Sequence, residues 1–298
     1  MTAQQRLPVA DTESGAPGTP APENKKTSRA GRDLPAAIAV GAALGAMAIG
    51  SLLFAPKWWF PLLSIAMAIA THEVIRRLRE HGYVMPVVPL LVGGQAMIWL
   101  AWPWGVAGTL GAYGATIVVA MVWRLLGQGL REAPVNYLRD IAASVLLATW
   151  VPLFASFTAL LIFQDNGGAR VFTVIATVVF ADIGGYTAGV LFGKHLLAPA
   201  ISPKKSWEGL GGSLLFGIAA SVLSVTFLLH KPAWVGLPLG LMLVITGVLG
   251  DLVESQVKRD LGIKDMGTLL PGHGGIMDRI DAMLPSAVAG WIVLTLLA

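Results

Sequence analysis

The stretch GDLVESQVKRDLGIKDMGTLLPGHGGIMDRID, from Gly250 to Asp281, interrupts an otherwise apolar sequence. Apolar runs lie on both sides of it, at 233–250 and 282–298. Each run approaches the roughly 20 residues that a membrane helix needs. A polar segment between two such runs predicts a loop at a membrane surface. We therefore expect an all-α polytopic membrane protein rather than a water-soluble domain.

The composition of the whole chain agrees with this fold class. Of 298 residues, 55% are hydrophobic and 13% are charged, whereas a soluble domain usually carries about 25% charged residues. No cysteine is present, which excludes a disulfide framework and thiolate chemistry. HEVIR, from His72, lacks the second histidine of a zinc-protease motif, because Arg76 stands in its place. The net charge of +4 fits anchoring at an anionic leaflet better than nucleic-acid binding.

Nine segments are candidate transmembrane helices. They are 34–54, 58–75, 84–101, 104–123, 141–163, 171–192, 210–229, 233–250 and 282–298. With the N-terminus in the cytoplasm, the inner segments hold 18 of the 21 Lys and Arg residues, so the positive-inside rule supports this orientation and an outer C-terminus. Residues 1–33 are rich in Pro, Ala, Gly, Ser and Thr, and predict a disordered cytoplasmic tail. The transmembrane domain is then 34–298.

A first polar cluster is FADIGGYTAGVLFGK, Phe180 to Lys194. Asp182 lies inside a predicted span, where a charge costs on the order of 2.5–3.5 kcal/mol at the bilayer centre. We therefore expect it to face a functional cavity; a packing seam with one satisfied aspartate is the structural alternative. Three glycines at four-residue spacing share its helix face and would let a second helix approach closely: Gly185, Gly189 and Gly193.

A second cluster is ISPKKSWEG, Ile201 to Gly209. Ser202 and Pro203 predict a helix start, with the serine as N-cap and the proline at the first helical position. Free N–H groups at such a start attract anions, and Lys204 and Lys205 add positive charge. The segment is a candidate phosphate site. A basic pair that contacts only lipid head groups explains the charge equally well.

The third cluster is the Gly250–Asp281 segment itself. At helical spacing two groups of residues share a face: Asp251, Glu254, Ser255 and Lys258 in one, Asp278 and Asp281 in the other. Carboxylates that converge from two helix ends suit Mg²⁺, a hard cation that prefers oxygen ligands. The surrounding cations suit a polyphosphate, and the glycines let the backbone approach a ligand. A solvated, salt-bridged loop is the alternative, and it leaves the glycines unexplained.

This third cluster resembles the signature of the phosphatidate cytidylyltransferases, or CDP-diacylglycerol synthases. The matching positions lie within 255–281 and are Ser255, Lys258-Arg259, Lys264-Asp265, Gly267, Pro271, His273-Gly274-Gly275 and Asp278-Arg279-Ile280-Asp281. ISPKKSWEG and GGYTAGVLFGK are also similar to segments of this family. The resemblance covers roughly residues 180–281, and the first half of the chain is similar only as a polytopic membrane region.

The resemblance implies an all-helical enzyme of the cell membrane, often a homodimer, whose active site faces the cytoplasm. It implies that CTP and phosphatidic acid give CDP-diacylglycerol and pyrophosphate. Mg²⁺ is the expected cofactor, with one or two ions left open. Membrane lipids are expected partners, and nucleic acid is not.

Residue roles follow from that reaction as expectations. Asp251 and Asp278 are the first choice as metal ligands, Asp281 is next, and Asp182 and Glu254 are candidates. The residues expected to bind substrate are Ser202, Lys204, Lys205, Ser255, Lys258, Arg259, Lys264, Gly274, Gly275 and Arg279. His273 is expected to shape the loop or donate a hydrogen bond rather than act as a base. A phosphate monoester is already an adequate nucleophile, so catalysis should be mainly positioning and charge neutralisation.

Two other classes of protein stay open on the sequence alone. One is a different nucleotide–lipid enzyme, such as a CDP-alcohol phosphotransferase or a CTP-dependent polyprenol kinase. The spaced aspartates that identify the phosphotransferase do not occur here. The other is a transporter or channel in which Asp182 and Asp251 line an ion path, which leaves His-Gly-Gly and the lysines unexplained.

Overall fold

A computed structural model describes residues 45–127, 129, 132–269 and 274–298, and the predicted tail 1–33 lies outside these ranges. After a helix at Gly45–Phe54, the first half contains η1 (Pro56–Trp58), α2 (Trp59–Glu80), α3 (Val87–Trp99), α4 (Ala101–Leu126), α5 (Tyr137–Ala148), η2 (Thr149–Leu153) and α6 (Phe154–Ile162). The second half contains α7 (Gly167–Phe192), β1 (Leu196–Ala198), β2 (Ser202–Ser206), α8 (Trp207–Leu223), η3 (Ser224–Leu228), η4 (Ala233–Val235), α9 (Gly236–Asp260), α10 (Met277–Ile280) and α11 (Met283–Leu297).

Seven helices in the described ranges are long and apolar enough to cross a membrane. They are Pro56–Glu80, Ala101–Leu126, Tyr137–Ile162, Gly167–Phe192, Trp207–Leu228, Ala233–Asp260 and Met277–Leu297. Two other predicted spans coincide with shorter apolar helices, Gly45–Phe54 and Val87–Trp99. The described residues are mostly helical, with one two-stranded hairpin, and are consistent with the predicted polytopic membrane protein. The count of nine spans and the orientation of the termini stay predictions.

Two of the spans contain breaks that the sequence explains. The span Tyr137–Ile162 contains a π-helical turn, η2, with Pro152 inside it. Proline has no N–H to donate and its ring clashes with the preceding turn, so a wider turn relieves both problems. Gly105, within α4, has φ +57° and ψ −140°, a conformation that glycine adopts readily.

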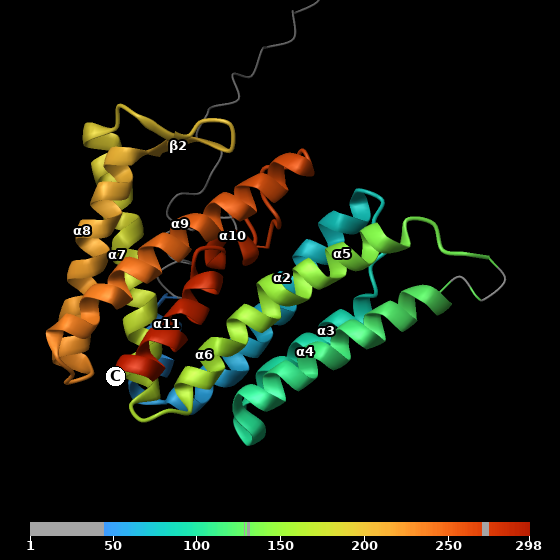
Figure 1. Cartoon of the computed structure of the whole chain (residues 1–298), viewed down its shortest axis with the longest axis horizontal. Helices are drawn as coiled ribbons and strands as arrows, with labels where there is room; N and C mark the ends of the chain where they lie inside the picture. The colour runs from blue at the N-terminus through green and yellow to red at the C-terminus, as the bar shows by residue number, and fades with distance from the viewer. Residues whose placement is uncertain (1–44, 128, 130–131, 270–273) are drawn as a thin grey trace, which may run out of the picture. The chain divides into compact units, whose positions relative to one another are not determined.

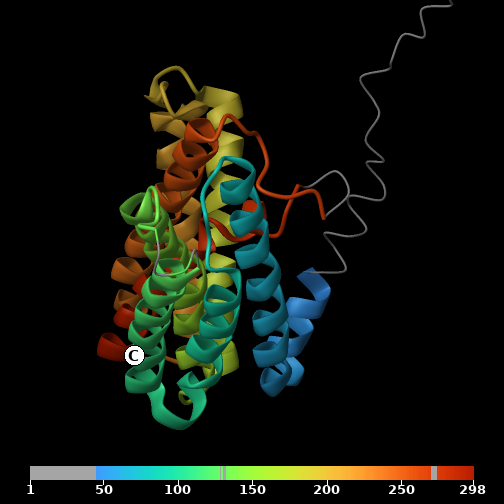
Figure 2. The same cartoon turned by 90° about the vertical axis from the view of Figure 1, so that its right-hand side faces the viewer.

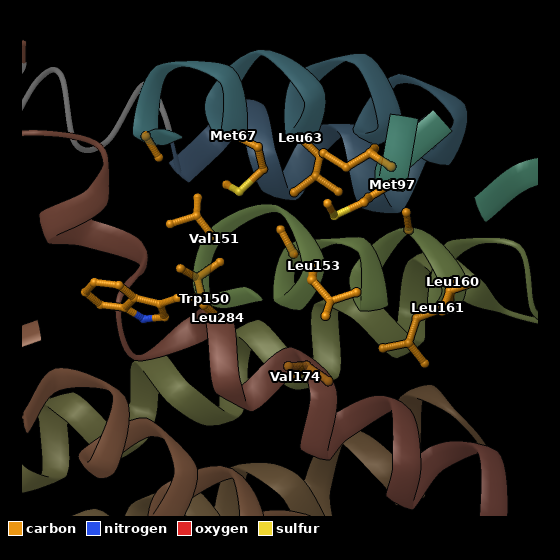
Figure 3. Close-up of a cluster of buried hydrophobic side chains, with 14 of the residues drawn as sticks. Leu63, Met67, Met97, Trp150, Val151, Leu153, Leu160, Leu161, Val174 and Leu284 are labelled. Carbon is orange, nitrogen blue, oxygen red and sulfur yellow. The ribbon is translucent and has the colours of Figure 1, made fainter. Parts of the chain in front are cut away.

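The buried core lies where α2, α3 and α6 meet α7 and α11 (Figure 3). Leu63 and Met67 of α2 point toward Val151 and Leu153 of the π-helical turn (Figure 3). Leu284 of α11 belongs to the same cluster. This core therefore attaches the last helix of the chain to helices of the first half.

Helices α7 and α8 run side by side (Figure 1). A Cβ added at Gly184 would lie 2.5 Å from the carbonyl oxygen of Gly212, so the two backbones approach too closely for larger residues. Gly185 is equally close to Ser213, whereas a Cβ at Gly189 would make only ordinary contact with Gly209, and Gly193 lies beyond the helix as its C-cap. The close helix approach predicted from the glycine spacing is present.

A buried ion pair joins α4 to α5. Arg124 is 3% exposed and Asp140 is fully buried, and their side chains lie 2.9 Å apart, from Nη2 to Oδ2. Arg139 lies 3.1 Å from the other oxygen of the aspartate. The arginine Nη2 also donates to the carbonyl oxygen of Val135 at 2.7 Å. The carboxylate of Asp140 thus has two cationic partners. Arg124 also links α4 to Val135, just before the start of α5.

The hairpin and the C-terminal end of α9 lie at one end of the helical body, and the C-terminus of the chain lies at the other (Figures 1 and 2). The second and third polar clusters of the sequence therefore meet at one end.

Candidate active site

The basic hairpin leads directly into α8. Strands β1 and β2 pair antiparallel, and the helix begins at Trp207, where the Oγ of Ser206 caps it by accepting the N–H of Gly209 at 3.1 Å. The predicted helix start at Ser202 and Pro203 is wrong. These two residues lie in β2, because the residue before a proline favours extended backbone.

Two side chains fasten this hairpin to the neighbouring helices. Glu208 accepts the backbone N–H groups of Lys194 and His195 at 3.1 and 3.2 Å. Arg259 of α9 donates from Nε to the carbonyl oxygen of Ile201. Arg259, expected to bind phosphate, therefore also holds the hairpin against α9.

A cavity of about 340 Å³ opens between the hairpin, α7, α8 and α9. Its polar lining includes residues from three separate parts of the sequence: Asp182, Tyr186, Ser202, Lys204, Lys205 and Asp251. Lys205 lies 2.5 Å from Asp251, between Nζ and Oδ2. The cavity brings two predicted metal ligands, Asp182 and Asp251, together with both lysines of the hairpin.

Three carboxylates form a cluster beside this cavity. One oxygen from each of Asp251, Glu254 and Asp281 lies within 4.8 Å of the others. Glu254 is fully buried and contacts Lys258. Its Oε1 has no hydrogen-bond partner among the described residues. Ser255 donates to Asp251 at 3.3 Å. An all-oxygen donor set with an unpartnered buried oxygen fits a hard divalent cation.

Asp278 is not a member of this cluster. Its carboxylate accepts the backbone N–H groups of Met266, Gly267 and Gly275, at 3.0, 3.3 and 2.8 Å. Lys258 donates to it as well, at 3.1 Å. Its oxygens therefore hold the signature loop together, while Asp281, three residues later, faces the cluster.

Two residues of α2 contact the signature loop and were missed as site residues. Glu73 accepts the backbone N–H of Met277 at 3.0 Å, and Arg77 donates to the carbonyl oxygen of Met266 at 2.9 Å. A charged residue inside a predicted span was the available signal. The same rule that selected Asp182 also applies to Glu73.

The other predicted residues lie in the hairpin or in the signature loop. Lys204, Lys264 and Arg279 are exposed. Gly274 has φ +83° and lies against Asp278, which accounts for a glycine there. His273 lies outside the described residues, so its expected role stays a prediction.

Comparison with known proteins identifies the family. A model of the cytidylyltransferase family matches residues 35–297. A phosphatidate cytidylyltransferase of Mycobacterium bovis is 56% identical over 298 residues, which cover 97% of this chain and 96% of the relative. One of Mycobacterium leprae is 58% identical over 284 residues, 92% and 91% of the two chains. One of Staphylococcus epidermidis is 42% identical over 122 residues, 41% and 47%. The chain belongs to the cytidylyltransferase family, as its signature segment predicts.

Proposed function

We propose that the chain transfers CMP from CTP to phosphatidic acid, giving CDP-diacylglycerol and pyrophosphate. Relatives that match more than nine-tenths of the chain are named for this activity. The structural observation that carries the proposal is the position of Asp251. This residue belongs both to the carboxylate cluster and to the lysine-lined cavity. The proposed cation site and the proposed phosphate site thus share one residue.

Asp251, Glu254 and Asp281 are the residues that would hold Mg²⁺. Their fit rests on the clustered oxygens and on the unpartnered Oε1 of Glu254 in the described part of the chain. When bound, a divalent cation would neutralise the charge of the reacting phosphates. Asp182 lines the adjoining cavity and stays a candidate ligand. We assign Asp278 to the loop, since its oxygens accept three backbone N–H groups.

The remaining chemistry is charge neutralisation and alignment. A phosphate oxygen of phosphatidic acid attacks the α-phosphorus of CTP, the bond to the β-phosphate oxygen breaks, and pyrophosphate leaves. Both reactants are anions, so the chain must bring them together rather than activate a weak nucleophile. Lys204 and Lys205 line the cavity and can contact phosphate directly. Lys258 already contacts Glu254 and Asp278, which holds its charge at the edge of the cluster.

We further propose nine spans, with the tail 1–33 and the active site in the cytoplasm, the C-terminus outside, and the cell membrane as the location. The basic-residue bias supports this orientation, as does the position of the hairpin and the end of α9 at the same end of the helical body (Figure 1). Because the chain has no cysteine, Pro203→Cys and Thr268→Cys each create a single thiol. Both should react only with membrane-permeant reagents, whereas Lys57→Cys and Lys231→Cys should react from outside.

The homodimer expected of the family is a separate proposal, to be tested by cross-linking in membranes.

The reaction is tested with CTP labelled in one phosphate at a time. Purified protein, phosphatidic acid and Mg²⁺ should move the α-phosphate label into the lipid phase and leave the γ-phosphate label in pyrophosphate. A CTP-dependent lipid kinase would instead move the γ-phosphate label into the lipid and leave the α-phosphate label in CDP. A transporter would give no labelled lipid from either preparation of labelled CTP, and that result would contradict the proposed activity.

A further inference from the structure

Helix α2 belongs to the half of the chain that carries no signature residue, yet it contacts the signature loop at two points. Glu73 accepts the N–H of Met277, and Arg77 donates to the carbonyl oxygen of Met266. The two side chains are four residues apart and so share a face of the helix. Glu73 is only 8% exposed. A buried carboxylate of the first half is therefore in contact with the loop.

Two glycines of the loop pack against this carboxylate. A Cβ added at Gly275 would overlap the side chain of Glu73, which supplies all three of its nearest atoms. A Cβ added at Gly267 would overlap Glu73 too, and would also lie 2.8 Å from the Cα of Gly275. Glu73 thus leaves no room for a Cβ at Gly275, whereas Gly267 is confined both by Glu73 and by the backbone of Gly275. Neither reason depends on a ligand.

The hydrogen bond to Met277 falls at the start of α10. The first N–H groups of a helix have no partner within the helix, and Glu73 supplies an acceptor for one of them. Asp278 accepts the N–H of Gly275 from within the loop. Asp281 follows directly after α10, as its C-cap. The position of Asp281 beside Asp251 therefore depends on how the start of α10 is held.

We propose that Glu73 is a positioning residue for nucleotidyl transfer. It touches no substrate; it holds the start of α10 and the two loop glycines so that Asp281 lies beside Asp251 and Glu254. This inference rests on the proposed role of that carboxylate cluster. It assigns a role in the reaction to a helix outside the signature.

A first experiment compares Glu73→Ala with Glu73→Gln. Alanine removes the acceptor for Met277, and a small misplacement of reacting groups can lower turnover about 100-fold. We expect kcat to fall by that order, with KM for CTP and phosphatidic acid little changed. Glutamine keeps the size and one acceptor oxygen, so it should recover most of the loss. Ser64→Ala, another buried polar change in α2, should leave kcat unchanged.

A second experiment tests the packing directly. Gly275→Ala should be severely impaired in the native background, because its Cβ overlaps Glu73. In a Glu73→Ala background the same change should cost little further activity, a coupling that a double-mutant cycle measures. Gly267→Ala is the matched control. Its Cβ also meets the backbone of Gly275, so Glu73→Ala should not relieve it.

Mg²⁺ binding gives a readout that does not depend on turnover. Binding to the folded state raises Tm, so the rise in Tm with Mg²⁺ should weaken in Glu73→Ala and persist in Glu73→Gln. If Glu73→Ala does not accumulate, Glu73→Asp replaces it, since the shorter side chain draws its oxygens back from Met277 and Gly275.

Three results would overturn the proposal: native kcat per folded molecule in Glu73→Ala or Glu73→Asp, no recovery in Glu73→Gln, or an equal cost of Gly275→Ala in both backgrounds. Failure of the metal cluster itself would be visible elsewhere, as normal turnover in Asp251→Asn.

Discussion

Two charged clusters in this molecule differ in how their charges are balanced. At the junction of α4 and α5, Asp140 has Arg124 and Arg139 as partners. Between α9 and α10, three carboxylates lie together. Among the described residues, the ion pairs of that second group are those of Asp251 with Lys205 and of Glu254 with Lys258.

We interpret the difference as that between a structural cluster and a proposed binding site. A buried carboxylate that is fully paired contributes to folding, and its loss leaves an uncompensated charge. A cluster with surplus negative charge and an unpartnered oxygen on Glu254 still has carboxylate oxygens that can bind a cation. Removing one of its charges should therefore cost function and not stability.

The largest expected effect is on turnover in the surplus cluster. Asp251→Asn and Asp281→Asn each keep the size of the side chain and remove a negative charge. Each should lower kcat/KM by a factor of roughly 10³, about 4 kcal/mol of transition-state stabilisation. Tm should be unchanged or higher, because like charges repel. Normal turnover per folded molecule in both variants would contradict the metal assignment.

The paired cluster should respond in the opposite way. Asp140→Asn leaves Arg124 buried without its carboxylate and should destabilise the protein by about 3 kcal/mol. Turnover per folded molecule should stay near native, because the pair lies outside the site. Thermal unfolding and turnover are measured on the same preparation. Arg139→Gln, at a partly exposed position, is the control and should cost much less stability.

Asp278 should combine both responses. Asp278→Asn loses part of the acceptor for Met266 and Gly275 and leaves Lys258 with one partner fewer. We expect the free energy of unfolding to fall by about 1–3 kcal/mol, which lowers Tm. Turnover should fall as well. A variant that loses turnover at native Tm, with a weaker Mg²⁺ effect on Tm, would instead make Asp278 a metal ligand.

The smallest expected effect is in the hairpin. Changing Lys204 and Lys205 together to Ala should weaken substrate binding about tenfold, equivalent to 1.4 kcal/mol. The loss should appear in KM, since both lysines line the cavity and neither is buried in the core. Unchanged KM for both CTP and phosphatidic acid would reduce the pair to an interaction with lipid head groups.

The sequence predicts the family signature and the seven long apolar helices of the described residues, because both depend on local patterns. The difference between Asp278 and Asp281 was not predictable. Helical spacing places them on one face, but their partners differ: Asp278 accepts N–H groups of the signature loop, whereas Asp281 lies with Asp251 and Glu254. The helix start was misplaced by four residues, because Ser202 and Ser206 are both suitable caps and the pairing of β1 with β2 decides between them.

The contacts of α2 were beyond any local pattern. Glu73 lies 204 residues from Met277 in the sequence, and Arg77 lies 189 from Met266. Such contacts follow from how the apolar helices pack as a group, and spacing along one helix carries no information about that packing. The charge of Glu73 inside a span indicated that it needed a partner, without indicating which one.

That separation has a consequence for how the protein is made. Translation adds roughly 5–20 residues per second, so the ribosome finishes the partner of Glu73 about 10 to 40 seconds after it makes Glu73 itself. During that time α2 is in the insertion machinery or the membrane, and the carboxylate of Glu73 has no Met277 N–H to accept. The contact is therefore completed only late in synthesis, and a nascent chain released before Met277 lacks the Glu73 contact that holds the start of α10.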